Sequence, residues 1–142
     1  MHQTAELFCN ALEAREVDAA AALLADDVVF RSPVVFTPYH GRDAVRGILA
    51  AVFRALDDWS CVREIGSSDG PDHALVFQAR IGDRQIEGCD FLHIDQDDSI
   101  DEFYVMVRPL SGALALAEAV QAQLASSDSS IHDHEPGDAQ VP

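Results

Sequence analysis

Residues 89–109 read CDFLHIDQDDSIDEFYVMVRP, which are two alternating stretches joined by an acidic turn. Alternation places every second side chain on the same face of a strand, so Asp90 faces the same way as the apolar residues of both stretches. Those apolar residues are Leu92, Ile94, Phe103, Val105 and Val107. The segment therefore predicts an antiparallel hairpin whose inner face is apolar apart from one carboxylate.

A carboxylate on an apolar face has two interpretations. Asp90 is either a structural acid that backbone or helix donors satisfy, or a working group. Burial disfavours the charged form and raises the pKa of a carboxyl, which makes it useful as an acid, a base or a hydrogen-bond donor. Both interpretations stay open at the level of sequence.

Size and charge exclude several classes of protein. The 142 residues are enough for one domain and too few for two. The net charge is −16 and the chain has no Lys, which argues against nucleic acid or a membrane as partner. With neither a membrane-length apolar run nor a signal-peptide pattern, we expect a cytoplasmic protein.

The cysteine and histidine patterns predict no metal site and no cofactor. Cys9, Cys61 and Cys89 are widely spaced and contain no C-x-x-C pair, so neither a disulfide framework nor a zinc site is expected. The tail segment His132-Asp133-His134-Glu135 carries ligand types, but a tail without preformed geometry is expected to have no metal-binding role.

The remaining periodicity predicts an α+β domain. Helices are expected at about 4–15, 18–24, 41–56 and 111–125, and strands at about 28–33, 59–65, 73–81, 85–94 and 100–108. Short connections rich in Gly, Asp and Ser indicate antiparallel hairpins, so a curved antiparallel sheet should wrap around the N-terminal helices, with a C-terminal helix added. We place the domain at 1–125 and a disordered acidic tail at 126–142.

This order of elements resembles a known superfamily. The segment LADDVVFRSP at 24–33, the helix start GRDAV at 41–45 and the hairpin at 90–109 are together similar to the nuclear transport factor 2-like superfamily, in its SnoaL-like branch of polyketide cyclases and ketosteroid isomerases. The resemblance covers about residues 4–125. It implies a cone-shaped half-barrel, a cystatin-like α+β roll, with a deep apolar cavity and commonly a dimer.

The catalytic positions of the related enzymes survive only in part. The resemblance places Ser32 where ketosteroid isomerases have their Asp base, Phe8 where they have a Tyr donor, and Asp90 where they have a protonated Asp. Serine is no base near neutral pH without a helper, and Phe donates no hydrogen bond. The resemblance also places Val105 where the epoxide hydrolases of this superfamily have an Asp in the closing strand. Steroid isomerisation and epoxide hydrolysis are therefore not predicted.

His73 is the second polar candidate. A turn centred on Gly82-Asp83 places Leu75 opposite Asp90 and His73 opposite Leu92, so His73 would share the face of Asp90 one diagonal step away. The alternative interpretation places His73 at a solvated strand end.

Two functions remain. The first is a small-molecule-binding protein whose apolar cavity holds a polyketide-, terpenoid- or steroid-like ligand anchored by Asp90; the second is a cyclase, isomerase or dehydratase with Asp90, aided by His73, as general acid or base. Whether the chain is an enzyme stays open. The residues expected to line the pocket are Phe8, Phe30, Ser32, Tyr39, Trp59, Leu75, Phe77, Leu92, Phe103, Val105 and Val107.

The outer face of the predicted sheet suggests a partner. Val76, Phe91, Tyr104 and Met106 alternate outward among polar residues. Such a mixed apolar face is seldom left in water, so we expect a homodimer through this face.

Overall fold

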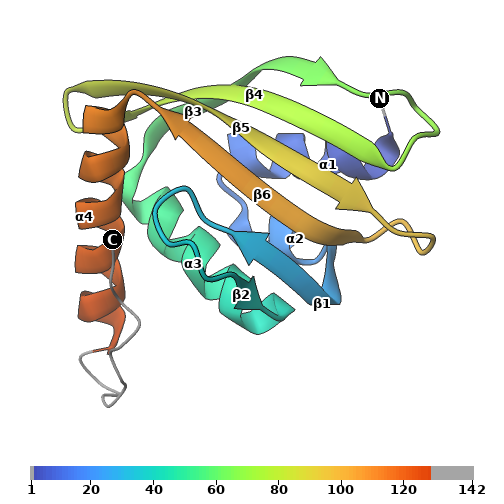
Figure 1. Ribbon diagram of the computed structural model, residues 1–142, viewed down its shortest axis with the longest axis horizontal. Helices are drawn as coiled ribbons and strands as arrows, with labels where there is room; N and C mark the ends of the chain where they lie inside the picture. The colour runs from blue at the N-terminus through green and yellow to red at the C-terminus, as the bar shows by residue number, and fades with distance from the viewer. Residues whose placement is uncertain (1, 129–142) are drawn as a thin grey trace.

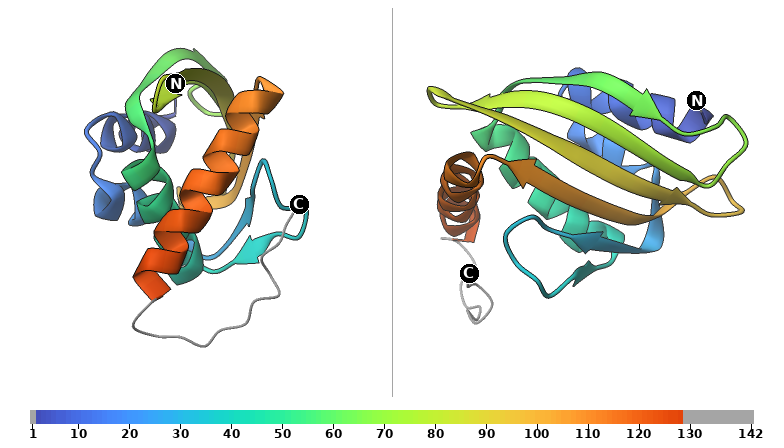
Figure 2. Two further views of the ribbon diagram at one scale, coloured as in Figure 1. Left: turned by 90° about the vertical axis from the view of Figure 1, so that its left-hand side faces the viewer. Right: turned by 45° about the horizontal axis from the view of Figure 1, so that its top comes forward.

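A curved six-stranded sheet dominates the computed structural model, which describes residues 2–128 (Figure 1). Helices α1, α2 and α3 lie against one face of the sheet, and α4 stands across the end at which β6 finishes (Figure 2). The elements are, in chain order, α1 (Gln3–Glu13), α2 (Val17–Ala21), β1 (Leu24–Arg31), β2 (Tyr39–His40), α3 (Arg42–Ala55), β3 (Asp57–Ile65), β4 (Asp72–Ile81), β5 (Arg84–Ile94), β6 (Ile100–Arg108) and α4 (Leu110–Asp128). The predicted α+β class is confirmed.

The strands lie in the order β2-β1-β6-β5-β4-β3. The β1 and β6 strands pair in parallel, whereas the other neighbours pair antiparallel. The predicted register between β4 and β5 is confirmed, because Leu75 lies opposite Asp90 and His73 opposite Leu92. Every second residue of β4 is buried from His73 to Ile81, as expected for a strand with one face toward a core.

Several elements differ from the prediction. The second helix ends at Ala21, and β1 begins at Leu24, where parallel pairing with Ile100 fixes the strand. Tyr39 and His40 form the short strand β2 on Val29 and Phe30, although the sequence gives them no strand pattern. The α4 helix continues through residues 126–128, which the sequence assigned to the tail; the rest of that tail lies outside the described residues.

Apolar side chains fill the space between the helices and the sheet. Phe8 of α1 meets Phe103 of β6 edge to face at 5.3 Å, and Phe30 of β1 lies 4.9 Å from the same Phe103 ring. This aromatic cluster joins the first helix to β1 and β6, and β6 pairs with β5, the strand that carries Asp90. Within residues 2–128, no helix combines the length and the apolar character needed to cross a bilayer.

Candidate functional site

A pocket lies between the concave face of the sheet and α3. The centre of a water-sized sphere can reach about 60 Å³ of it, and the unfilled space is about 530 Å³ when open solvent at the mouth is included. Its lining comes from helices α1, α3 and α4, from five strands and from the segments beside them: Leu12, Phe30, Pro33, Val45, Ile48, Leu49, Val52, Phe53, Leu56, Trp59, Phe77, Ile86, Asp90, Phe103, Val105, Val107 and Leu116.

Asp90 is the only ionisable side chain among these lining residues. It sits in the middle of β5, with Leu75 of β4 on one side and Val105 of β6 on the other. The side chain is almost fully buried, with 3% of its surface exposed. Within the described part of the chain, no donor forms a hydrogen bond or an ion pair with its carboxyl. The acid is thus surrounded by hydrocarbon and faces the empty space.

This environment keeps the carboxyl protonated at neutral pH. Desolvation by burial raises the pKa of Asp90 from 3.8 to about 8. At pH 7 the neutral form then outnumbers the ionised form by about ten to one. A neutral carboxyl has a hydrogen-bond donor and an acceptor to offer, whereas a carboxylate only accepts.

Flat aromatic side chains form much of the pocket wall. Trp59 of β3 stacks on Phe77 of β4 with ring centroids 5.4 Å apart and an interplanar angle of 25°. The ring of Phe53 on α3 also contacts Trp59, with ring centroids 6.0 Å apart. These rings present flat, polarisable surface to the cavity, which suits a ligand with a flat apolar body.

Seven of the residues singled out from sequence line the pocket together: Phe30, Trp59, Phe77, Asp90, Phe103, Val105 and Val107. They come from five strands and meet because the sheet curves around them (Figure 1).

Five expected lining residues lie elsewhere. Phe8, Leu75 and Leu92 pack in the core, with at most 2% of each exposed, and reach no free space. The Ser32 hydroxyl accepts hydrogen bonds from the amides of Val34 and Val35 at 3.0 Å each, so it orders its own loop. Tyr39 packs against Phe30 with ring centroids 6.1 Å apart, outside the lining.

The structure does not bring His73 into the pocket, and it does not leave His73 in solvent. The ring is 3% exposed, and its Nε2 lies 2.7 Å from the Gly70 carbonyl oxygen. His2 packs edge-on at 5.7 Å. The register that places His73 diagonal to Asp90 is correct, but the ring turns toward the loop before β4. The predicted help for Asp90 is therefore replaced by a local structural contact.

Sequence reasoning missed the helical side of the pocket. The lining residues of α3 are spaced as one apolar helical stripe, in which Val45, Leu49 and Phe53 are buried and Ile48 and Val52 are half-buried, and such stripes normally pack without a gap. Periodicity identifies such a stripe and carries no information about how closely it approaches the sheet. The cavity is thus a property of the spacing between α3 and the strands.

The SnoaL-like domain family matches residues 5–103. This chain is similar to a steroid delta-isomerase from Pseudomonas aeruginosa whose crystal structure is known. The two sequences are 38% identical and the structures have a TM-score of 0.82, over 87% of this chain and 90% of that one. An uncharacterised bacterial protein with a cystatin-like fold from Silicibacter pomeroyi DSS-3 is 30% identical, with a TM-score of 0.83, over 87% of this chain and 86% of that one.

More distant structures share the fold alone. The epoxide hydrolase/cyclase-like enzyme SalBIII is 16% identical, with a TM-score of 0.62, over 75% of this chain and 88% of that one. The curated proteins include no similar sequence. The family match spans well over half of the chain, and the fold agrees with it from α1 to β6. This protein belongs to the SnoaL-like domain family.

Proposed function

We propose that this protein binds a small, flat, apolar molecule that carries one hydrogen-bond acceptor such as a ketone oxygen. The single observation that carries the proposal is the isolated acid, a neutral Asp90 carboxyl in a pocket otherwise lined by hydrocarbon and aromatic rings. A polyketide-, terpenoid- or steroid-like ring system matches that combination.

The energetics favour a ligand acceptor at Asp90. A buried donor without a partner costs about 1–3 kcal/mol, and a ligand oxygen that accepts from the carboxyl removes this cost. Apolar rings of the ligand that pack on Trp59 and Phe77 contribute roughly 25 cal/mol of binding free energy for each Å² of apolar surface that they bury. The carboxyl therefore orients the ligand, while the rings supply most of the affinity.

A second candidate is a cyclase, isomerase or dehydratase in which Asp90 acts as general acid or base. The similarity to the steroid delta-isomerase, at 38% identity, favours it. If the neutral Asp90 donates a proton in such a reaction, a second group near the reacting atoms must accept one. Within the described residues, the pocket lining offers no second titratable side chain, and Ser32 is turned to its own loop. Binding is for this reason our first proposal.

The test uses the built-in reporter Trp59, which is the single Trp of the chain and lines the pocket. Progesterone, a flat ketone, is titrated into the protein while the tryptophan fluorescence is followed. Asp90→Leu should weaken binding by about tenfold or more, because it removes the donor and keeps the bulk. Asp90→Asn should bind nearly as well, because its amide still donates.

The pH dependence separates the two roles. Binding by the wild type should weaken as pH rises above about 8, where Asp90 ionises and stops donating, and binding by Asp90→Asn should not change there. Equal affinity of Asp90→Leu and the wild type would exclude the anchoring role. Turnover of a β,γ-unsaturated ketosteroid that disappears in Asp90→Asn would instead favour the enzyme.

We also propose that two copies pair through the outer face of the sheet. Phe91, Tyr104 and Met106 are 41%, 39% and 52% exposed there, and the Phe91 and Tyr104 rings are 6.3 Å apart. A charged side chain in such a patch opposes association, so Tyr104→Glu combined with Met106→Glu should give monomers in size-exclusion chromatography with light scattering. Leu114→Glu, at an exposed site on α4, is the control and should leave the state unchanged. A monomeric wild type would exclude this dimer.

A further inference from the structure

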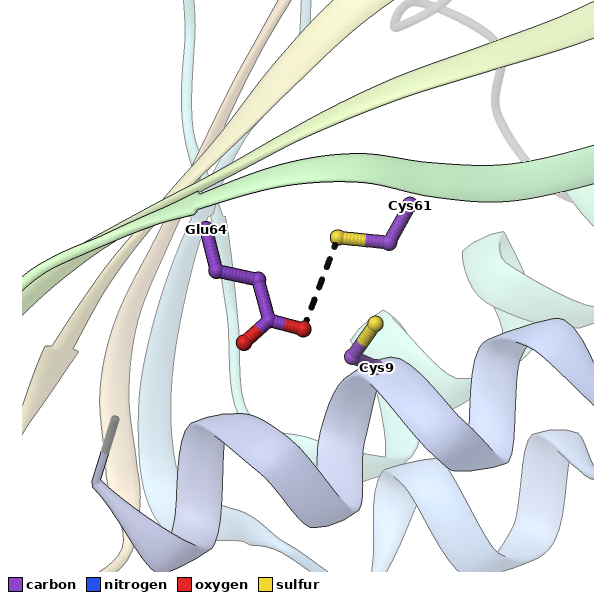
Figure 3. Close-up of side chains that lie close together, drawn as sticks. All are labelled: Cys9, Cys61 and Glu64. Carbon is purple, nitrogen blue, oxygen red and sulfur yellow. Dashed lines mark hydrogen bonds between the residues drawn. The ribbon is translucent and has the colours of Figure 1, made fainter.

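Two cysteines and a glutamate from separate elements converge outside the pocket. The Cys9 sulfur on α1, the Cys61 sulfur on β3 and a carboxylate oxygen of Glu64 all lie within 4.8 Å of one another. Figure 3 shows the Cys61 and Glu64 side chains reaching from β3 toward Cys9. Cys9 is buried, Cys61 is half-buried and Glu64 is exposed, so the group is open to solvent on one side.

A β-bulge creates this convergence. In a regular strand, residues three apart point to opposite faces, which would separate Cys61 from Glu64. The pairing of β3 with β4 shifts register between Cys61 and Arg63, so Cys61 lies opposite Phe77 and Glu64 opposite Leu75. Both partners belong to the inner face of β4. The bulge thus turns both ligand-type side chains toward α1, as bulges often do near functional sites.

The chemistry of the cluster suits a thiophilic divalent cation. We propose that Cys9, Cys61 and Glu64 form a binding site for Zn²⁺, with the open side left for water as the fourth ligand. Zinc binds thiolate sulfur at about 2.3 Å and carboxylate oxygen at about 2.0–2.2 Å in a tetrahedron, which places neighbouring ligand atoms roughly 3.5 Å apart. Because no two of the three atoms are more than 4.8 Å apart, they need to approach one another by at most about 1.3 Å to reach that geometry.

The surrounding charge favours a cation over a disulfide. The Glu64 carboxylate lies 4.0 Å from the Cys61 sulfur, and Glu13 accepts a hydrogen bond from the Cys61 amide at 2.9 Å. Two carboxylates beside two thiols make the surroundings of the cluster negative, which attracts a divalent cation. A divalent cation offsets this negative charge when the thiol protons leave to solvent. A disulfide also gives no reason for the Glu64 carboxylate to point at the sulfur atoms.

The experiment uses the full-length reduced protein. His132 and His134 in the tail are ligand types as well, so both are replaced by Ala in every sample. Zn²⁺ is titrated against a chromophoric chelator, and Co²⁺ is then used in its place to detect the thiolate-to-cobalt charge-transfer band. We expect one ion per chain, a charge-transfer band, and a higher melting temperature with Zn²⁺ than without it.

Three variants localise the site. Cys61→Ser should lose the charge-transfer intensity of one thiolate and at least about 100-fold in affinity, more than a supporting residue usually contributes. Glu64→Gln should keep the band and lose about tenfold. Cys89→Ser is the control at the third cysteine, which lies on β5 outside the cluster, and should match the parent. Circular dichroism of the metal-free variants checks that each is folded.

Two results would overturn the proposal. One is Zn²⁺ binding that is unchanged in folded Cys61→Ser, which would place the ion elsewhere. The other is reduced protein that binds no Zn²⁺ while hydrogen peroxide joins Cys9 and Cys61 in a disulfide, two thiols being oxidised and the peroxide reduced to water. The cluster would then be a redox pair.

Discussion

Asp90→Asn is expected to stabilise the protein at neutral pH and to remove most of the pH dependence of its stability. The folded state holds the Asp90 proton up to a pKa of about 8, whereas the unfolded chain releases it near the ordinary value of 3.8. This contribution to stability is therefore fully present below about pH 4 and is lost progressively as pH rises to about 8. By pH 7 the loss is on the order of 4 kcal/mol. Asparagine keeps the shape and does not ionise.

Urea denaturation of both proteins between about pH 4 and pH 8 measures the effect. The difference between the two unfolding free energies should grow by roughly 1.4 kcal/mol per pH unit in this range. A difference is needed because His93, whose pKa is raised by its hydrogen bond to Asp101, also contributes stability that falls as pH rises. His93→Gln is the control and should retain the Asp90 slope. Parallel curves for wild type and Asp90→Asn would contradict the prediction.

Gly88→Ala is expected to destabilise the fold by about 3 kcal/mol. An added Cβ at Gly88 in β5 would lie 2.6 Å from the Met106 carbonyl oxygen in β6 and would also meet the Phe77 ring. The carbonyl belongs to the neighbouring strand and moves only if the sheet opens. Displacement of Phe77 disturbs its stack with Trp59, so the pocket wall and the fluorescence of Trp59 should change as well.

Gly47→Ala is the matched control for this prediction. Gly47 lies on the exposed side of α3, and an added Cβ there meets nothing within 4 Å. Ala is favoured over Gly in a helix interior, so this variant should gain about 0.5–1 kcal/mol. Urea denaturation ranks the two variants. If Gly88→Ala were as stable as the wild type, Phe77 and β6 would have to move at almost no cost.

The sheet was predictable because its information is local. Alternation in residues 89–108 sets which side chains share a face, and the Gly82-Asp83 turn sets the register, so the position of Asp90 opposite Leu75 followed from counting. The start of β1 and the strand β2 were not predictable in this way. The start of β1 depends on Ile100, which is distant in sequence, and β2 pairs with Val29 and Phe30 without a strand pattern of its own.

Among the candidate site residues, sequence reasoning placed seven correctly on the pocket wall and misplaced those whose role depends on a loop contact or on depth. The Ser32 hydroxyl bonds to amides of its own loop, and His73, near the start of β4, bonds to the Gly70 carbonyl in the loop before that strand. Periodicity describes neither contact. Phe8 and Leu92 face inward as expected, yet close packing covers them before they reach the cavity.

By itself the sequence determined the order of the elements, the face on which each strand residue lies and the presence of one inward acid. Only the tertiary structure decided that α3 stops short of the sheet and leaves a pocket around Asp90. The fold likewise decided that Cys9 meets Cys61 and Glu64, a cluster that the absence of a C-x-x-C pair had argued against. The physical reason is the same in both cases. Periodicity records direction along one element, whereas cavities and ligand clusters depend on distances between elements and on irregularities such as the bulge in β3.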